Sequence, residues 1–261
     1  MTDILSHTEA GVLTLTFNRV ARKNSITGAM YDTLATALEK AADDNAVRTV
    51  LIQGDPTIFS AGNDIADFMA AAAAAAPAQQ TEADSPAIRF LRVIAAFPKP
   101  LVASVCGPAV GIGTTLLFHC DLVYAGDNAA FSLPFVNLGL VPEAASSMLV
   151  PQMFGYHRAA EALLLGEPFM AEAALEVGLV NRVVPPMECN GIAQSQARKL
   201  AAKPLTALVE TKRLLKLSQQ AAVQERIGVE GASFATAMRS PAAKEAFTAF
   251  MEKRKPDFSK V

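Results

Sequence analysis

The segment PLVASVCGPAVGIGTTLLFHCD, residues 100–121, constrains the fold of this chain more than any other. It opens with an apolar, β-branched run over 101–106 that lies between a proline and a glycine, which predicts a buried strand. An apolar run over 114–118 predicts a helix, and three glycines separate the two, at positions 107, 111 and 113. Free N–H groups at the start of such a helix suit an oxygen with negative charge, either a phosphate or a transient oxyanion.

The glycines alone do not identify a ligand. The dinucleotide fingerprint G-x-G-x-x-G fails because Leu116 stands where the third glycine belongs. The phosphate-loop pattern fails as well, because no lysine follows Gly113. A tight strand-to-helix turn that binds nothing is the alternative that these residues leave open.

The segment FSAGNDI, residues 59–65, repeats this arrangement, with a strand end, small residues, a glycine and a helix start. If the two strand ends are neighbours in a sheet, each can aim a backbone N–H group at one point between them. The alternative is an ordinary loop in which Asp64 caps the following helix.

Glu143 is the carboxylate that the pattern singles out. It follows a proline in the uncharged stretch FVNLGLVPEAASSMLVPQM, ahead of a small-residue helix start. Apolar neighbours reduce the hydration of a carboxylate, so its pKa should rise toward the range that is useful for moving protons near neutral pH. A glutamate in a first helical turn that merely complements the helix dipole is the alternative.

Composition limits the class of protein. The chain of 261 residues is 51% hydrophobic, so it is globular and can bury one large core. A net charge of −2 gives no electrostatic reason to expect nucleic acid, and no apolar run reaches the roughly 20 residues of a membrane span. The first residues, MTDILSHTEAG, do not resemble an export leader. The three cysteines are unpaired in pattern and indicate a cytoplasmic protein; they and the three histidines have no metal-ligand spacing.

The first two thirds of the chain predict parallel β/α units. Residues 4–17 alternate as a hairpin, and a polar, basic loop follows over 18–25. Thr27 then caps a helix in which Met30, Leu34 and Leu38 keep helical spacing. Further strands are predicted at 47–52 and 121–126, with a helix at 87–97. A helix that frays into a mobile loop is predicted between 69 and 86.

The pattern becomes helical after Phe154. We expect helices over 156–165, 171–177, 193–202, 205–218 and 223–238, a short strand over 180–184, and a basic amphipathic tail over 247–255. His119 and Cys120 are interpreted as residues of the core or of a helix end. The change near residue 190 divides the chain into a β/α part, 1–190, and a helical appendage, 191–261, for packing and oligomerisation.

Together these motifs resemble the crotonase, or enoyl-CoA hydratase/isomerase, superfamily over essentially the whole chain. The resemblance lies in FNRVARKNSI, FSAGNDI, CGPAVGIGTTLLFHCDLVYAGDNAAFSLPF, LGLVPEAASS, GLVNRVV and FMEKRKPDF. It implies an α/β fold, a spiral of ββα units with a C-terminal helical region, usually in trimers or paired trimers. It also implies an acyl-CoA thioester whose carbonyl oxygen lies between two backbone N–H groups, here those of Asn63 and Ile112.

The departures from the family pattern favour one branch. Hydratases of the family carry two glutamates that handle water, and these positions hold Thr115 and Phe135 here. Glu143 lies instead where the peroxisomal-type Δ3,Δ2-enoyl-CoA isomerases carry their single catalytic glutamate. The resemblance therefore implies isomerisation of 3-enoyl-CoA to 2-enoyl-CoA in fatty-acid β-oxidation.

The resemblance implies further contacts with substrate and with coenzyme A, which is part of the substrate; no other cofactor and no metal are expected. These contacts are at Arg22, Lys23, Ala61, Gly62, Asp64, Gly111, Phe135, Phe250 and Lys253. Solvated surface charge is the alternative for the basic residues. The alternatives for the function are a hydratase, another enolate reaction such as decarboxylation or dehalogenation, and an inactive protein that binds CoA thioesters or RNA.

Overall fold

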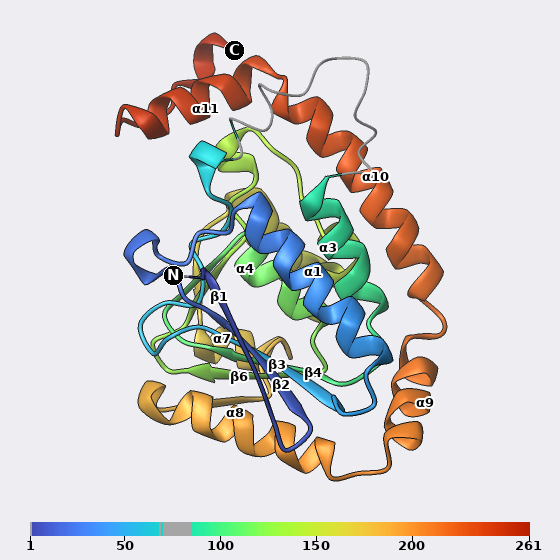
Figure 1. The fold of residues 1–261 in the computed structure, drawn as a ribbon. Helices are drawn as coiled ribbons and strands as arrows, with labels where there is room; N and C mark the ends of the chain where they lie inside the picture. The colour runs from blue at the N-terminus through green and yellow to red at the C-terminus, as the bar shows by residue number, and fades with distance from the viewer. Residues whose placement is uncertain (1, 68, 70–84) are drawn as a thin grey trace.

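Two β-sheets form the centre of the computed structural model, which describes residues 2–67, 69 and 85–261 (Figure 1). The larger sheet has the strand order β1 (Ile4–Glu9), β2 (Val12–Phe17), β3 (Thr49–Gln53), β4 (Leu101–Val105), β6 (Leu122–Gly126) and β9 (Arg182–Val184). The smaller sheet contains β5 (Pro108–Val110), β7 (Ala130–Ser132) and β8 (Phe169–Met170). β1 and β2 pair antiparallel, whereas every pair from β2 to β9 in the larger sheet is parallel. The predicted hairpin and the predicted parallel units are both confirmed.

The chain winds as a spiral in which a strand of the larger sheet is followed by a short strand of the smaller one. β4 leads into β5, and β6 leads into β7, which pairs parallel with β5. After β3, Ser60 takes the place of a strand in the smaller sheet, because it forms a parallel bridge with Ala109 of β5. The spiral of β-rich units that the resemblance implies is confirmed.

Side chains alternate along the larger sheet between two hydrophobic cores. On one face, α1 (Gly28–Asp43) and α3 (Pro86–Ala96) lie side by side, and α8 (Pro186–Ala201) covers the other face (Figure 1). Within β3, Val50 and Ile52 face the α1–α3 side, and Leu51 faces α8. The three central residues of β3 are therefore apolar because the strand is buried on both faces.

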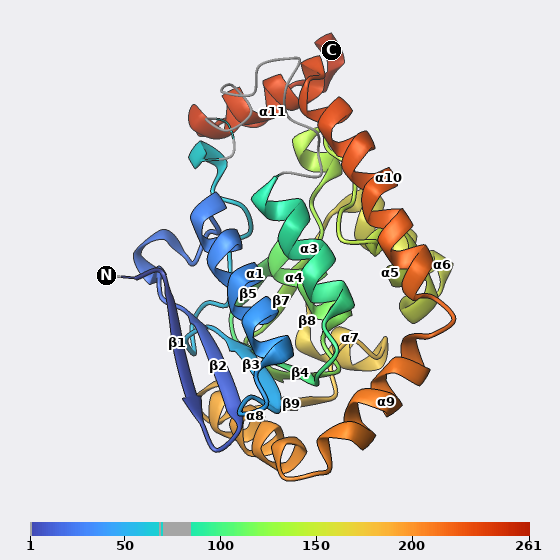
Figure 2. The ribbon, with the colours of Figure 1, turned by 45° about the vertical axis from the view of Figure 1, so that its right-hand side comes forward.

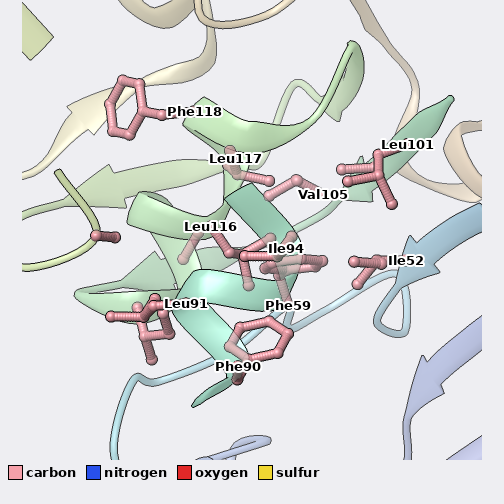
Figure 3. Close-up of a cluster of buried hydrophobic side chains, with 14 of the residues drawn as sticks. Ile52, Phe59, Phe90, Leu91, Ile94, Leu101, Val105, Leu116, Leu117 and Phe118 are labelled. Carbon is pink, nitrogen blue, oxygen red and sulfur yellow. The ribbon is translucent and has the colours of Figure 1, made fainter. Parts of the chain in front are cut away.

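The core under α3 lies beside the predicted ligand-binding turns. Figure 3 shows side chains of α3 gathered against Phe59, β4 and Leu116. Phe59 and Phe90 are fully buried, and each such aromatic ring contributes about 1.5–3 kcal/mol relative to an exposed one. Phe59 also packs edge-on against Phe17 of β2, at 5.2 Å between ring centroids. These contacts hold the segment before Ser60 rigidly against the sheet.

The element boundaries differ from the predictions in several places. The helix after the glycines begins earlier than Thr114, as α4 (Ile112–Thr115), and continues as a 3₁₀ turn, η3 (Leu116–His119). The strand β5 precedes it, and the polar loop over 18–25 contains a 3₁₀ turn, η1 (Val20–Arg22). Single turns and three-residue strands have no periodicity of their own, so the sequence pattern does not reveal them. Thr27 caps α1 as predicted, since its hydroxyl accepts a hydrogen bond from the N–H of Met30.

Other helices and helical turns complete the fold. They are η4 (Val136–Leu138), α5 (Ser146–Phe154), α6 (Tyr156–Ala160), the π-helical turn η5 (Glu161–Leu165), α7 (Ala171–Glu176), α9 (Leu205–Lys216), α10 (Gln220–Met238), α11 (Pro241–Met251) and η6 (Phe258–Lys260). Figure 2 shows α10 along the side of the molecule, next to α3 and α5. The helix predicted from residue 193 begins at Pro186, because proline suits a first helical turn and Cys189 already faces the sheet.

Two further predictions are not tested by the structure. The fraying helix and loop between 69 and 86 fall mostly outside the described residues, and the division of the chain at residue 190 stays a prediction. Among the helices that the structure describes, none is both long and apolar enough to cross a membrane.

Candidate active site

The two glycine turns, over 59–65 and 107–113, lie next to each other in the fold. The N–H of Ser60 donates to the carbonyl of Pro108 at 3.0 Å, and the N–H of Val110 donates to the carbonyl of Ser60 at 2.9 Å. Gly62 has φ of +88°, and a Cβ atom there would lie 2.9 Å from the carbonyl oxygen of Val110. A Cβ atom on Gly113 would lie 3.1 Å from the side chain of Ser60. Glycine at these positions lets the two backbones approach each other closely.

Each turn presents a free backbone donor. Asn63 forms a parallel bridge with Ile26, in which the flanking groups, the carbonyl of Gly62 and the N–H of Asp64, bond to Ile26 at 2.8 and 2.9 Å. The N–H of Asn63 therefore points away from Ile26. Ile112 is the first residue of α4, so its N–H has no acceptor within the helix. Neither N–H group donates to any acceptor in the described part of the chain.

Glu143 is buried, with 9% of its surface exposed, as its apolar neighbours predict. Its Oε1 has no hydrogen-bond partner among the described residues. Burial, with a smaller contribution from the negative charge of Glu230, raises the pKa of Glu143 to about 8. A carboxylate with this pKa can accept a proton near neutral pH and release it again.

The side chain of Tyr31 is bonded to the turn at Asn63. The side chain of Tyr31 comes from α1 and is buried, and its hydroxyl donates to Oδ1 of Asn63 at 2.5 Å. Burial raises the pKa of Tyr31 well above its ordinary value, and the charge of Glu143 raises it further. The phenol of Tyr31 is therefore bonded to the side chain of Asn63 and is within reach of the charge of Glu143.

The segment that follows Glu143 is held from two sides. Nε2 of His119 lies 2.9 Å from the carbonyl oxygen of Ala144, and the carboxylate of Glu230 accepts the N–H groups of Ala145 and Ser147 at 2.6 and 2.8 Å. Burial, together with the nearby charge of Lys216, lowers the pKa of His119 to about 3. His119 is thus a neutral residue of the core at the end of η3, as predicted.

The other predicted contact residues are spread over the structure. Arg22 and Lys23 are exposed, and the carbonyl of Lys23 accepts the N–H of Ala61 at 2.9 Å, which places this loop beside the turn at Asn63. Phe250 and Lys253 are exposed at the end of α11.

Asp64 and Gly111, two of the predicted contact residues, form hydrogen bonds within the protein, and a third, Phe135, is buried. Asp64 pairs with Arg19 at 2.6 Å and accepts the N–H of Asp67, so it caps the following helix as the alternative reading holds. The hydrogen bond from Arg19 holds the pKa of Asp64 below its usual range. Phe135 is buried, and Gly111, at φ of +55°, donates its N–H to the carbonyl of Ser132.

Sequence reasoning missed Tyr31 and Glu230. Tyr31 is part of the apolar face of α1 and has no polar pattern around it. Glu230 could have been found by the signal that identified Glu143, because it lies among small and apolar residues in the sequence GVEGASF. Across residues 2–67, 69 and 85–261, no group of three or more histidine, cysteine, aspartate or glutamate side chains could hold a metal ion.

Known proteins resemble this chain over its length. Residues 7–260 match the family model described as enoyl-CoA hydratase/isomerase. The enoyl-CoA delta isomerase 2 of Rattus norvegicus is 39% identical over 220 residues, which is 83% of this chain and 55% of the rat protein, so the chain spans about half the length of that relative. The 2,3-dehydroadipyl-CoA hydratase of Escherichia coli is 34% identical and matches over 99% of both chains. The solved structure of Pseudomonas aeruginosa OdaA is 44% identical, covers 96% of this chain and 99% of its own, and superposes with a TM-score of 0.90.

Proposed function

The chain belongs to the enoyl-CoA hydratase/isomerase family, and from this premise we propose that it isomerises 3-enoyl-CoA thioesters to 2-enoyl-CoA thioesters. Glu143 takes a proton from C2 of the acyl chain and returns it at C4. The double bond thereby moves into conjugation with the thioester, and no water is consumed. The relatives include both isomerases and hydratases, so the choice of reaction depends on the site itself.

Glu143 is the observation that carries this proposal. Its buried carboxyl group has a free oxygen and a pKa of about 8, so its charged and neutral forms are close in free energy near neutral pH. A residue that accepts a proton and then releases it works best when its charged and neutral forms have similar free energies. One carboxyl group can do both steps when it reaches both carbons.

The thioester oxygen would be held by the N–H groups of Asn63 and Ile112. Removal of the C2 proton gives an enolate whose oxygen gains nearly a full negative charge, and two donors fixed by the fold stabilise that charge without reorganising. Loss of one such donor in other enzymes costs about 2.7–4 kcal/mol of barrier. Because both donors belong to the backbone, the side chains at these positions can vary.

The second candidate function is hydration of a 2-enoyl-CoA. This reaction would need a second carboxylate beside Glu143 to activate water. Glu230 is such a neighbour, but both of its oxygens already accept backbone N–H groups of the 143–147 segment. The two positions at which family hydratases carry their glutamates hold Thr115 and Phe135 here, and both of these side chains are buried. Thr115 and Phe135 carry no carboxylate, and Glu230 is bonded to the backbone, which supports isomerisation over hydration.

Assays of the wild type and of Glu143→Gln on both substrate classes test the proposal. We expect the wild type to isomerise 3-enoyl-CoA much faster than it hydrates 2-enoyl-CoA. Glutamine keeps the size of the side chain but cannot accept the proton, so isomerisation should fall by at least about 10³-fold while the Kd for the CoA thioester changes little. Glu225→Gln, on the exposed face of α10, is the matched control and should retain full activity. Full isomerase activity in Glu143→Gln, or hydration as the faster reaction, would contradict the proposal.

We also propose that the chain assembles as a homotrimer or homohexamer. The exposed residues Leu214, Leu215 and Leu217 lie at the end of α9, where they offer apolar surface for such contacts. Light scattering across a concentration series tests this, and a monomer at all concentrations would refute it.

A further inference from the structure

The backbone that follows Glu143 has a conformation that its own sequence does not favour. Ala144 and Ala145 have φ of +63° and +59°, in the left-handed region that residues with a Cβ atom seldom adopt. Two such residues in succession persist only where the surrounding structure imposes them. The position of the Glu143 side chain therefore depends on contacts from elsewhere in the chain.

Glu230 supplies the largest share of these contacts. It lies on α10, far along the chain, and is 5% exposed. Its Oε2 accepts the N–H of Ala145 and its Oε1 accepts the N–H of Ser147, so one carboxylate spans the start of α5. Ala145 occupies the N-cap position of α5 and has no side-chain acceptor of its own, so Glu230 takes the place of a capping residue.

Further hydrogen bonds hold the same segment. His119 lies against the carbonyl of Ala144, and the carbonyl of Glu143 accepts both the N–H and the hydroxyl of Ser146, at 3.0 and 2.6 Å. With Glu230 these bonds fix the peptide groups on both sides of the left-handed pair. The backbone from which the Glu143 side chain projects is therefore held by η3, by α10 and by Ser146.

We propose that Glu230 is a positioning residue for Glu143, which fixes the 143–147 segment and places a second negative charge beside the base. The inference rests on the proposed role of Glu143. With Glu230 charged, uptake of a proton by Glu143 relieves repulsion between the two carboxylates, so Glu230 favours proton abstraction. The titratable groups whose charges act on Glu143 or on its partner are Glu230 from α10 and Tyr31 from α1. Burial raises the pKa of Glu230 above its ordinary value, while its hydrogen bonds to Ser147 and Ala145 and the charge of Arg226, one turn before it, oppose that rise.

The variant Glu230→Gln tests this, with Glu225→Gln on the same helix as its control. The amide oxygen of glutamine can accept one of the two N–H groups, but its NH₂ group faces the other, and the charge is lost. We expect kcat for 3-enoyl-CoA to fall by about 10–100-fold, with the Kd of the thioester within about threefold of the wild type. The acid limb of kcat/KM against pH should move down by about one pH unit, because Glu143 then ionises more readily.

Two further measurements separate positioning from a purely structural role. Glu230→Asp keeps the charge but is too short to reach both N–H groups, so its acid limb should stay in place while kcat falls. The infrared carbonyl band of the protonated Glu143, assigned by its absence in Glu143→Gln, should titrate at lower pH in Glu230→Gln. This band is read without turnover, so it tests Glu230 even if the wild type proves not to be an isomerase.

The results that overturn the inference are specific. An unmoved acid limb together with an unmoved infrared titration in Glu230→Gln would show that Glu230 does not act on Glu143. Wild-type kcat in Glu230→Asp would show that its reach to the segment is unimportant. A loss of thioester binding as large as the loss of kcat would assign Glu230 to general folding.

Discussion

Replacing Glu143 by glutamine should stabilise the folded protein at alkaline pH. Glu143 has a pKa of about 8 in the folded state, against an ordinary value of 4.5. Between these values the folded protein holds a proton at this position that the unfolded chain has lost. Its contribution to the free energy of unfolding is therefore fully present below about pH 4.5 and is lost as the pH rises through 8, by about 1.4 kcal/mol per pH unit.

The size of this effect follows from the burial of the side chain. At 9% exposure, solvent screens the charge poorly, so the loss over the whole interval is on the order of 4 kcal/mol. Glutamine has nearly the same shape and no charge at any pH, so the variant escapes the loss. The carboxylate that we propose as the catalytic base is thus predicted to lower the stability of the fold in the pH range in which it would work.

Urea denaturation of the wild type and of Glu143→Gln at pH 5, 7 and 8.5, at one protein concentration, measures the effect. The free energy of unfolding of the variant minus that of the wild type should rise by roughly 3–5 kcal/mol from pH 5 to pH 8.5. For the exposed control, Glu225→Gln, this difference should stay nearly constant. A difference for Glu143→Gln that is equally constant would refute the reasoning, because it would mean that folding does not raise the pKa of Glu143.

Two more substitutions probe the donor turn. Tyr31→Phe removes the hydroxyl that is bonded to Asn63, so we expect kcat/KM to fall about tenfold and the free energy of unfolding to fall by about 1 kcal/mol; unchanged kinetics would exclude a role for this tether. Gly62→Ala brings a Cβ atom to 2.9 Å from the carbonyl oxygen of Val110, whereas the control Gly178→Ala has a similar φ, +81°, and open space. Gly62→Ala should therefore lose about 1–3 kcal/mol more stability than the control, measured by urea denaturation, and most of the isomerase activity; equal losses would mean that the close approach is unimportant.

The parts of the fold that the sequence predicts are those set by local chemistry. The hairpin over 4–17 follows from alternation, the start of α1 follows from Thr27, and the burial of Glu143 follows from its uncharged neighbours. The two glycine turns could be recognised from their residues, whereas the sequence left open whether they are neighbours in the sheet.

The parts that it does not predict depend on contacts between distant segments. β5 has three residues and exists because β7 and Ser60 pair with it. Tyr31 looks like any core residue of α1, and its role depends on Asn63, which lies 32 positions further along. The helix predicted from Thr114 begins at Ile112 in the structure. The sequence does not reveal this start, because a short helix that continues as a 3₁₀ segment leaves no regular apolar spacing.

The bond between α10 and the segment after Glu143 has a consequence for how the protein matures. The sheets and α1 are complete within the first 184 residues, but the acceptor for Ala145 and Ser147 is residue 230. During synthesis the chain can therefore form its two sheets well before it can order the segment that carries Glu143. A ribosome-bound chain that stops short of α10 would contain Glu143 but would lack Glu230, whose carboxylate holds the segment after it.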